Sequence, residues 1–327
     1  MIDTIKIFLL ARELGLSWDI EEIKTRLQPA EKCKRALGRI GNMHVFGDNE
    51  KITIEGSLAK FCNKNNIQNF SFRMVKSSIN LLSQELGLPL QNARVKRIDV
   101  GVNIELNQDV PFYLIELFLL EHHQRITRHE TTLRFENNSH KVQLLFYDKL
   151  KWYEKKKKKE YLIDDIRHYT KAKNLMRVEL QIQERVSQIM GIKNVRVSDL
   201  YDPDFCKLLM KKWLGLYQSI FKEALPYYPK KFKGNLDFEK FLKRLIIQLL
   251  GWEKLNFIMR TAIKQKSLSA SDKSKKLKQF RIAMLDNSSF EFQEHTIELN
   301  HKIKVMYVEA LKQIFKMEQL SQQERVK

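Results

Sequence analysis

A tyrosine that ends an apolar segment and is followed directly by lysines is the first place in this sequence where chemistry could occur. The segment "KVQLLFYDKLKWYEKKKKKEY", residues 141–161, contains Tyr147, Lys149 and five consecutive lysines at 155–159. A tyrosine hydroxyl is a poor nucleophile at neutral pH because its pKa is about 10. Nearby cations or a metal ion favour the reactive phenolate, and lysines attract a phosphate backbone. One interpretation of the pattern is a tyrosine placed where a phosphodiester is held.

Two strand-like segments, "KRIDVGVN" and "MRVELQIQ", supply carboxylates that could act with this tyrosine. Alternation of side chains along a strand places Asp99 on one face with its neighbours two residues away, and does the same for Glu179 and for Tyr147. Adjacent strands lie about 4.8 Å apart, so Asp99, Glu179 and Tyr147 converge if the strands are neighbours. Two carboxylates suit Mg²⁺ or Mn²⁺, which could polarise a phosphate. The residues that share the three faces are Arg97, Asp99, Gly101 and Asn103; Arg177, Glu179, Gln181 and Gln183; and Lys141, Gln143, Leu145 and Tyr147.

An alternative interpretation of the same residues requires no active site. Tyr147 would be a half-buried strand tyrosine, and Asp99 and Glu179 would pair only with the neighbouring Arg97 and Arg177. The spacing by itself favours this alternative. Tyr153, six residues after Tyr147, is a rival nucleophile.

Several motifs that would indicate other chemistry are absent from the sequence. It contains no glycine-rich phosphate loop, no GxGxxG, no GxSxG, no HExxH and no His-hydrophobic-His. The three cysteines Cys33, Cys62 and Cys206 are widely spaced and form no CxxC. Nucleotide hydrolases, dehydrogenases, zincins and zinc ribbons are therefore disfavoured, and the few cysteines favour a reducing cytoplasm.

The charge of the chain indicates a polyanionic partner. Its 327 residues include 59 Lys and Arg against 39 Asp and Glu, for a formal charge of +20. Nucleic acid is the first expectation and an anionic membrane the second. No apolar segment approaches the ~20 residues that a membrane span needs, and the first residues do not resemble a signal peptide. We therefore predict a nucleic-acid partner and no membrane partner.

The elements that must position these residues are strands in the first part of the chain and helices in the second. Periodicity and turn residues predict strands at 3–10, within 32–57 on both sides of a turn at 47–50, and at 93–106, 131–138, 141–147 and 174–183. Shorter helical patterns lie between them, at 58–67, 70–87, 109–123 and 184–191.

After Gly191 strand patterns are nearly absent. A helix is predicted from Asp202 as N-cap and Pro203 at the first helical position, and further helices at 236–263 and 303–319. Residues 264–280 have low complexity and are predicted as a basic loop. The predicted fold class is α+β: an antiparallel-sheet domain at 1–195 followed by an all-helical, basic, DNA-binding domain at 196–327.

Five short motifs then occur in an order that resembles one known family. "MIDTIKI", "EGSLAKFCNKNN", "KRIDVGVNIEL", "LLFYDKLKWYEKK" and "LMRVELQIQERVSQIMGI" are similar to segments of the gene II/gene X replication proteins of filamentous phages and related plasmids. The resemblance covers residues 1–195. One departure is Val178, where the family usually has an aromatic residue.

The resemblance implies a rolling-circle replication initiator that nicks and rejoins one strand of a phage or plasmid origin. The family's tyrosine matches Tyr147, which would form a 5′-phosphotyrosine intermediate, and its lysine matches Lys149. The acidic residues match Asp99 and Glu179, to which the chemistry of the residues adds Mg²⁺ or Mn²⁺. The expected partners are duplex and single-stranded origin DNA, with a host polymerase and helicase, in the cytoplasm of a bacterial host. The residues expected to contact DNA are Lys60, Asn66, Arg97, Lys155, Lys156, Lys157, Lys158, Lys159 and Arg177.

Two functions compete with this prediction. A non-catalytic origin-binding initiator would use the same basic surfaces without cutting DNA. An RNA-binding protein would prefer a structured RNA over origin DNA at matched salt.

Overall fold

The computed structural model divides the chain into two compact units. It describes residues 1–30, 33, 35–68, 70–137, 141–160, 170–222, 235–285 and 294–326. The first unit contains Met1–Ile115, Leu119–Ile220 and Glu298–Lys327, and the second contains Glu116–Phe118 and Phe221–Ile297. All of the predicted site residues that are described belong to the first unit.

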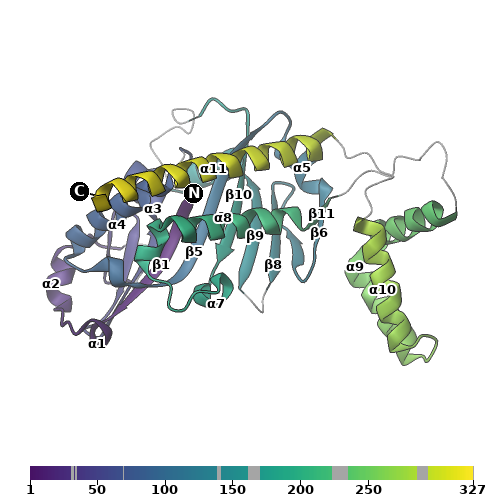
Figure 1. Ribbon diagram of the computed structural model, residues 1–327, viewed down its shortest axis with the longest axis horizontal. Coiled ribbons are helices and arrows are strands. Elements are labelled where there is room, and N and C mark those ends of the chain that lie inside the picture. Colours follow the sequence, from purple (N-terminus) through teal and green to yellow (C-terminus); the bar gives the residue numbers. More distant parts are fainter. Residues whose placement is uncertain are drawn as a thin grey trace. The chain divides into compact units, whose positions relative to one another are not determined.

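The first unit is built on a nine-stranded sheet with the order β2-β3-β4-β1-β5-β10-β9-β8-β7 (Figure 1). Every pair of neighbouring strands is antiparallel. The predicted antiparallel sheet of an α+β fold is confirmed. The strands are β1 (Ile2–Leu10), β2 (Gly38–Ile40), β3 (Met43–Gly47), β4 (Lys51–Ser57), β5 (Arg94–Leu106), β7 (Gln124–Thr127), β8 (Thr132–Asn137), β9 (Val142–Asp148) and β10 (Asn174–Ile182).

Alternation of apolar and polar residues gives this sheet two different faces. On β5, Ile98, Val100 and Val102 are buried on one face, and Met176, Val178, Leu180 on β10 and Leu144 and Phe146 on β9 are buried with them. The intervening residues carry the charges and the tyrosine. The apolar face therefore forms the core, and the polar face carries the predicted site.

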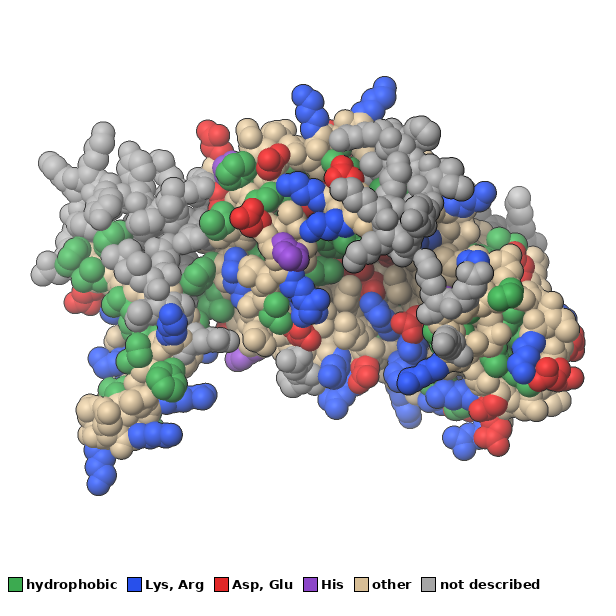
Figure 2. Space-filling model, turned by 180° about the vertical axis from the view of Figure 1, so that it is seen from behind, with side chains coloured by type: hydrophobic (Ala, Val, Ile, Leu, Met, Phe, Trp, Pro, Cys, Tyr) green, Lys and Arg blue, Asp and Glu red, His purple; other side chains and the backbone are tan. Residues whose placement is uncertain are grey.

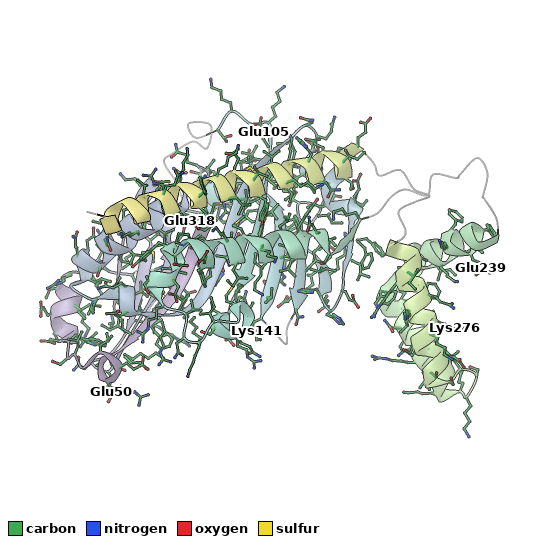
Figure 3. The ribbon with its side chains drawn as sticks, viewed as in Figure 1. Glu50, Glu105, Lys141, Glu239, Lys276 and Glu318 are labelled. Atoms are coloured by element: carbon green, nitrogen blue, oxygen red, sulfur yellow. The ribbon has the colours of Figure 1, made fainter. Side chains whose placement is uncertain are left out.

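Helices cover the apolar face. In Figure 1, α8 (Pro203–Gln218) and α11 (Glu294–Val326) both lie in front of the sheet. The rings of Phe146 on β9 and Tyr217 on α8 are 6.3 Å apart, and the Tyr217 hydroxyl donates to Oδ1 of Asn300 on α11 at 2.7 Å. An ion pair between Lys207 on α8 and Glu318, which Figure 3 labels on α11, also joins the two helices.

The division of the chain differs from the predicted boundary between residues 195 and 196. Helix α8 begins as expected, with the Asp202 side chain accepting from the Phe205 amide at 2.9 Å and Pro203 at the first position. Its buried side, which includes Leu209 and Trp213, packs in the unit that contains the sheet. The apolar face of the sheet needs a cover, and the sequence by itself does not tell which helices provide it.

The second unit contains a long helical pair that corrects one prediction. Residues 264–280 are not a basic loop, because α9 (Asn235–Lys264) is followed by α10 (Ala270–Leu285). The Ser269 hydroxyl accepts from the Asp272 amide at 3.0 Å and donates to the Asp272 carboxylate at 2.7 Å. This capping pattern, S-x-x-D, was visible in the sequence and starts the helix. Ile247, Leu255 and Met259 form a buried cluster in this unit.

The predicted helix at 109–123 is also shorter than expected. Helix α5 (Val110–Glu116) ends where β6 (Leu117–Leu120) begins, and β6 pairs with β11 (Ile220–Lys222). The second half of the apolar run forms a strand. The sequence did not predict this, because a short apolar run is compatible with either a helix or a strand. The remaining elements are α1 (Ala11–Leu14), α2 (Ile20–Thr25), α3 (Leu58–Asn63), α4 (Phe72–Leu86), α6 (Lys149–Glu160), α7 (Val186–Met190) and the 3₁₀ helices at Leu90–Asn92 and Val197–Tyr201.

Candidate active site

The sheet places the three predicted strands side by side, with β10 between β5 and β9. Arg177 lies opposite Asn103 on β5 and Tyr147 on β9, and Glu179 lies opposite Gly101. Asp99 lies opposite Gln181, the next residue of β10 on the same face as Glu179. The acidic residues and the tyrosine therefore share the polar face of the sheet, as the alternation predicted. We call it the uncovered face because α8 and α11 lie on the other one, although part of α6 packs against it.

Arg177 is the centre of this arrangement. Its side chain is buried, with the residue 3% exposed. Its Nη2 donates to Oδ2 of Asp3 at 2.5 Å, its Nε to Oε2 of Glu179 at 3.4 Å and its Nη1 to Oδ1 of Asn103 at 3.2 Å. In this position Arg177 orders two carboxylates, and its predicted contact with DNA stays a prediction.

Gly101 makes room for the guanidinium. A Cβ atom at residue 101 would lie 1.9 Å from Nη2 and 2.4 Å from Cζ of Arg177. Any larger residue at position 101 would therefore push Arg177 away from its partners. The sequence shows "RIDVGVN", but only the register of β5 against β10 explains the glycine.

Asp3 is a site residue that the sequence reasoning missed. It accepts hydrogen bonds from Ser57, from Nδ2 of Asn66 at 3.0 Å and from Arg177. Burial raises the pKa of Asp3, but the Arg177 charge and the two side-chain hydrogen bonds outweigh burial and hold the pKa at about 2. The carboxylate is therefore an anion at neutral pH. Its signal in the sequence was a single acid within the apolar strand "MIDTIKI".

Asp99 lies in a different electrostatic environment. Its carboxylate accepts from Nε and Nη2 of Arg97 at 2.9 and 2.6 Å, and the residue is only 1% exposed. Burial raises the pKa of Asp99 to about 7; the Arg97 hydrogen bond opposes the rise and the charge of Glu179 adds to it. The alternative from the sequence, that Asp99 and Glu179 pair with Arg97 and Arg177, describes contacts that the structure contains.

Tyr147 is 7% exposed and packs against Trp152, with ring centroids 6.0 Å apart. Burial raises the pKa of Tyr147 well above its usual value, and the charge of Glu179 raises it further, against the Arg177 charge. Tyr147 lines a cavity of about 450 Å³ together with Asp99 and Glu179. The nucleophile predicted from the sequence thus shares one cavity with both predicted metal ligands.

Lys149 is completely buried. Its Nζ donates to Oδ1 of Asn66 at 2.7 Å and lies 4.6 Å from the centre of the Trp152 ring and 5.8 Å from that of Tyr147. Burial and the Arg177 charge lower the pKa of Lys149 well below its usual value, against the opposing effect of Asp3. Asn66 lines the cavity and Lys149 does not. The direct contact of Asn66 and Lys149 with DNA stays a prediction.

The cavity opens on the face of the sheet opposite α8 and α11. Figure 2, seen from that side, shows Lys and Arg side chains around a hollow. Arginines from three parts of the sheet reach the cavity: Arg97 on β5, Arg128 directly after β7, and Arg134 on β8, with Lys60 from α3. Nζ of Lys60 lies 5.6 Å from the centre of the Trp152 ring. These cations suit a phosphate backbone.

The run of lysines continues from the tyrosine as helix α6. Lys155 is exposed on this helix. The side chains of Lys156, Lys157, Lys158 and Lys159 lie outside the described residues, and their predicted contacts with DNA stay predictions. Tyr153, the rival nucleophile, packs against a small cluster of Ile67, Leu150, Ala172 and Leu175 and does not line the cavity.

The donor set at the cavity fits a divalent cation. Asp99 and Glu179 bring carboxylate oxygens to one cavity, and the unfavourable charge of Glu179 contributes to the raised pKa of Asp99. A bound cation would relieve this repulsion, and oxygen ligands suit Mg²⁺ or Mn²⁺. Within the described part of the chain, no group of three or more His, Cys, Asp or Glu side chains is gathered as a ready metal site. Asp99 and Glu179 would hold the ion through carboxylate lone pairs that the hydrogen bonds from Arg97 and Arg177 do not use.

The comparisons with known proteins support the sequence reasoning. The family model for the N-terminal part of the phage gene II replication-associated protein matches residues 32–199, half of the chain. The chain belongs to this family of replication-associated proteins. The resemblance inferred from the five motifs is confirmed, and with it the predicted role in the initiation of rolling-circle replication. All of the predicted site residues lie within the matched segment.

Among solved structures, one match is a rolling circle replication initiator protein from Geobacillus stearothermophilus. It is 13% identical, with a TM-score of 0.34, over 73% of this chain and 89% of the other. No curated protein matches the chain. No helix in the described part of the chain is long and apolar enough to cross a membrane.

Proposed function

We propose that the chain initiates rolling-circle replication by nicking one strand of an origin through Tyr147 and later rejoining it. The observation that carries this proposal is that Tyr147, Asp99 and Glu179 line one cavity on the uncovered face of the sheet. Arg97 and Lys60 line the same cavity. A phosphodiester held there would face a hydroxyl nucleophile, acidic metal ligands and cations.

The reaction is a transesterification. The Tyr147 oxygen attacks the scissile phosphorus, the bond from phosphorus to the 3′ oxygen breaks, and a 5′-phosphotyrosine and a 3′ hydroxyl result. The Tyr147 proton needs an acceptor because burial raises its pKa. Lys149, whose Nζ lies 5.8 Å from the centre of the Tyr147 ring and whose pKa is lowered by burial, is our candidate for accepting that proton. The departing 3′ oxygen, which lies on the opposite side of phosphorus in an in-line displacement, takes up a proton from water.

A divalent ion held by Asp99 and Glu179 would supply positive charge for the non-bridging phosphate oxygens. Arg177 fixes Glu179, and Arg97 fixes Asp99, in the orientation that such a site needs. Asp3, held by Ser57 and Asn66, keeps Arg177 in place. These contacts preorganise the site before DNA arrives.

After the nick, host proteins would carry out DNA synthesis and strand separation. The released 3′ hydroxyl would prime a host polymerase while a helicase separates the strands. After one round a new 3′ hydroxyl would attack the phosphotyrosine and close the circle, without ATP because the linkage keeps the energy of the bond. We assign nicking to the unit that contains the sheet, in place of residues 1–195. Binding of the origin duplex we assign to the basic helices α9 and α10 of the second unit, in place of residues 196–327.

A nicking assay tests this proposal. A supercoiled plasmid that carries the cognate origin is incubated with the protein and Mg²⁺, and we expect an open circle with a protein-linked 5′ end. Tyr147→Phe is expected to abolish nicking and linkage while binding stays within a few-fold. Tyr153→Phe is the matched control and should nick normally. Nicking by Tyr147→Phe together with loss of nicking in Tyr153→Phe would overturn the assignment of the nucleophile.

One observation favours a non-catalytic initiator. Tyr147 is largely buried and packs against Trp152, so its hydroxyl must be uncovered before it attacks. The same assay separates the two functions, because a non-catalytic initiator would bind the origin and leave the plasmid supercoiled.

A further inference from the structure

A second hollow on the same uncovered face is not part of the catalytic cluster. It has a volume of about 580 Å³ and lies over β1, β3, β4 and the start of β5, beside the segment that leads into α7. We call it the basic groove. The cations that line it are Lys6, Lys51, Arg94, Lys96 and Arg185, and no Asp or Glu side chain lines it.

A row of aromatic and cationic residues crosses the floor of the basic groove. Phe46 on β3 lies opposite Thr53 on β4, Thr53 lies opposite Phe8 on β1, and Phe8 lies opposite Arg94 on β5. Both phenylalanines are only half-buried. Because neighbouring strands are about 4.8 Å apart, the small Thr53 separates two flat apolar surfaces that belong to strands about 10 Å apart.

The cations of the groove divide into paired and available groups. Lys6 pairs with Glu55 at 2.6 Å, and Arg94 pairs with Glu13 at 2.7 Å. Lys51, Lys96 and Arg185 are exposed and form no ion pair with any residue that the structure describes. Nζ of Lys51 instead lies 5.2 Å from the centre of the Phe8 ring. The charge of Lys51 also acts on the carboxylate of Asp48. Three exposed cations therefore border an apolar surface, and none forms an ion pair with a described residue.

A row of charged side chains lies between the basic groove and the catalytic cavity, which share no lining residue. Glu55 forms ion pairs with Lys6 and with Arg97, and Arg97 also forms an ion pair with Asp99. Asp99 follows Arg94 by five positions along β5, which is about 16 Å of strand. A chain of several nucleotides that leaves the catalytic cavity could follow β5 into the groove.

We propose that the basic groove binds unpaired nucleotides of the strand that is nicked, with bases stacked on Phe8 and Phe46 and phosphates held by Lys51, Lys96 and Arg185. This inference rests on the proposed nicking function. Unpaired bases fit because a phenylalanine ring can stack on a base only when that base is not stacked between its neighbours in a duplex. Every base has a flat aromatic face, so this stacking does not depend on sequence. The cations would hold the backbone without selecting a sequence.

Fluorescence anisotropy with labelled single-stranded oligonucleotides tests the groove apart from the nicking reaction. The full-length protein carrying Tyr147→Phe is used, so that no covalent product forms, with a 20-nucleotide oligothymidine as probe. The triple variant Lys51→Ala, Lys96→Ala, Arg185→Ala should bind at least about tenfold more weakly, and its plot of log affinity against log salt should be flatter by about 2. Phe8→Leu with Phe46→Leu should weaken binding about tenfold and leave that slope unchanged.

The control removes three exposed lysines from the helices on the opposite face, by Lys211→Ala, Lys304→Ala and Lys316→Ala. Circular dichroism melts verify that all variants are folded. Equal losses in the control and the groove variants, or no loss in either groove variant, would overturn the inference. A 20-base-pair duplex probe that loses as much affinity as the single strand would also overturn it. Nicking activity is not read, so a failure here leaves the role of Tyr147 standing.

Discussion

The uncovered face of the sheet contains two charged regions that differ in almost every physical respect. In the catalytic cluster, Asp3, Asp99 and Arg177 are buried, each is bonded to at least one partner, and the pKa values of the two acids move in opposite directions. In the basic groove, Lys51 and Lys96 are exposed and form no ion pair with a described residue. The two regions are joined by Arg97.

The difference separates two tasks that a nicking protein must perform. Buried charges are costly to bring together, and removing one partner leaves the other uncompensated. They are retained where chemistry needs fixed groups with shifted pKa values. Exposed cations cost little, respond to salt and bind a backbone in many registers. Catalysis and strand binding can therefore be removed independently.

The largest effect is expected from the acidic residues of the cluster. Asp99→Asn or Glu179→Gln should lower the nicking rate by at least about a hundredfold, because each removes a carboxylate from the proposed metal site. Chelation of divalent ions should stop nicking, and the variants should need more Mn²⁺ or Mg²⁺ for half-maximal rate. Glu105→Gln, on the exposed end of β5 (Figure 3), is the matched control. Normal nicking by both cluster variants would contradict the site.

The stability of the protein should depend on pH through Asp99. Its folded pKa of about 7 lies above the ordinary value of about 3.9. The stabilising contribution of the protonated group is therefore complete below about pH 4 and is lost as the pH rises through 7. Relative to Asp99→Asn, the wild type should lose about 2–3 kcal/mol between pH 5 and pH 8 without metal. Urea unfolding measures it, and parallel curves for the two proteins would refute the prediction. Asp3 does not interfere in this range, because its pKa is about 2.

A single methyl group should disturb the cluster. Gly101→Ala places a Cβ against the Arg177 guanidinium and should destabilise the fold by about 2 kcal/mol, with a further loss of nicking. Gly215→Ala on α8 is the matched control, because no atom lies within 4 Å of a Cβ there and alanine favours a helix. Thermal melts compare the two. A Gly101→Ala variant as stable as the wild type would show that Arg177 is free to move.

The smallest effect is expected at Trp152, which is 37% exposed above Tyr147 and Lys149. Trp152→Leu should weaken binding of a single-stranded oligonucleotide by several-fold, roughly 1 kcal/mol, because a stacking surface is lost, while the melting temperature changes little. Trp18→Leu serves as the control, since Trp18 lines neither the cavity nor the groove. Unchanged binding by Trp152→Leu would show that Trp152 packs within the protein and does not stack on a base.

Much of the site could be predicted from strand periodicity. Alternation placed Asp99 and Glu179 on one polar face, and the structure adds that β10 lies between the strands of Asp99 and Tyr147. The cap at Asp202 was visible as well. The basic loop predicted at 264–280 was wrong, although the capping pattern of Ser269 and Asp272 was present in the sequence.

The sequence by itself determined the pattern of faces and the net charge, because these depend on residue types and on their alternation. The family and the candidate nucleophile followed from the resemblance of five motifs in their order. Only the tertiary structure decided that Asp3 belongs to the site and that Lys149 is buried rather than exposed to solvent. It also decided that the Arg177 guanidinium occupies the position a Cβ atom at residue 101 would take. These facts depend on strand register and on contacts between residues as far apart as 3 and 177. Burial and pKa follow from such contacts, and no local pattern in the chain records them.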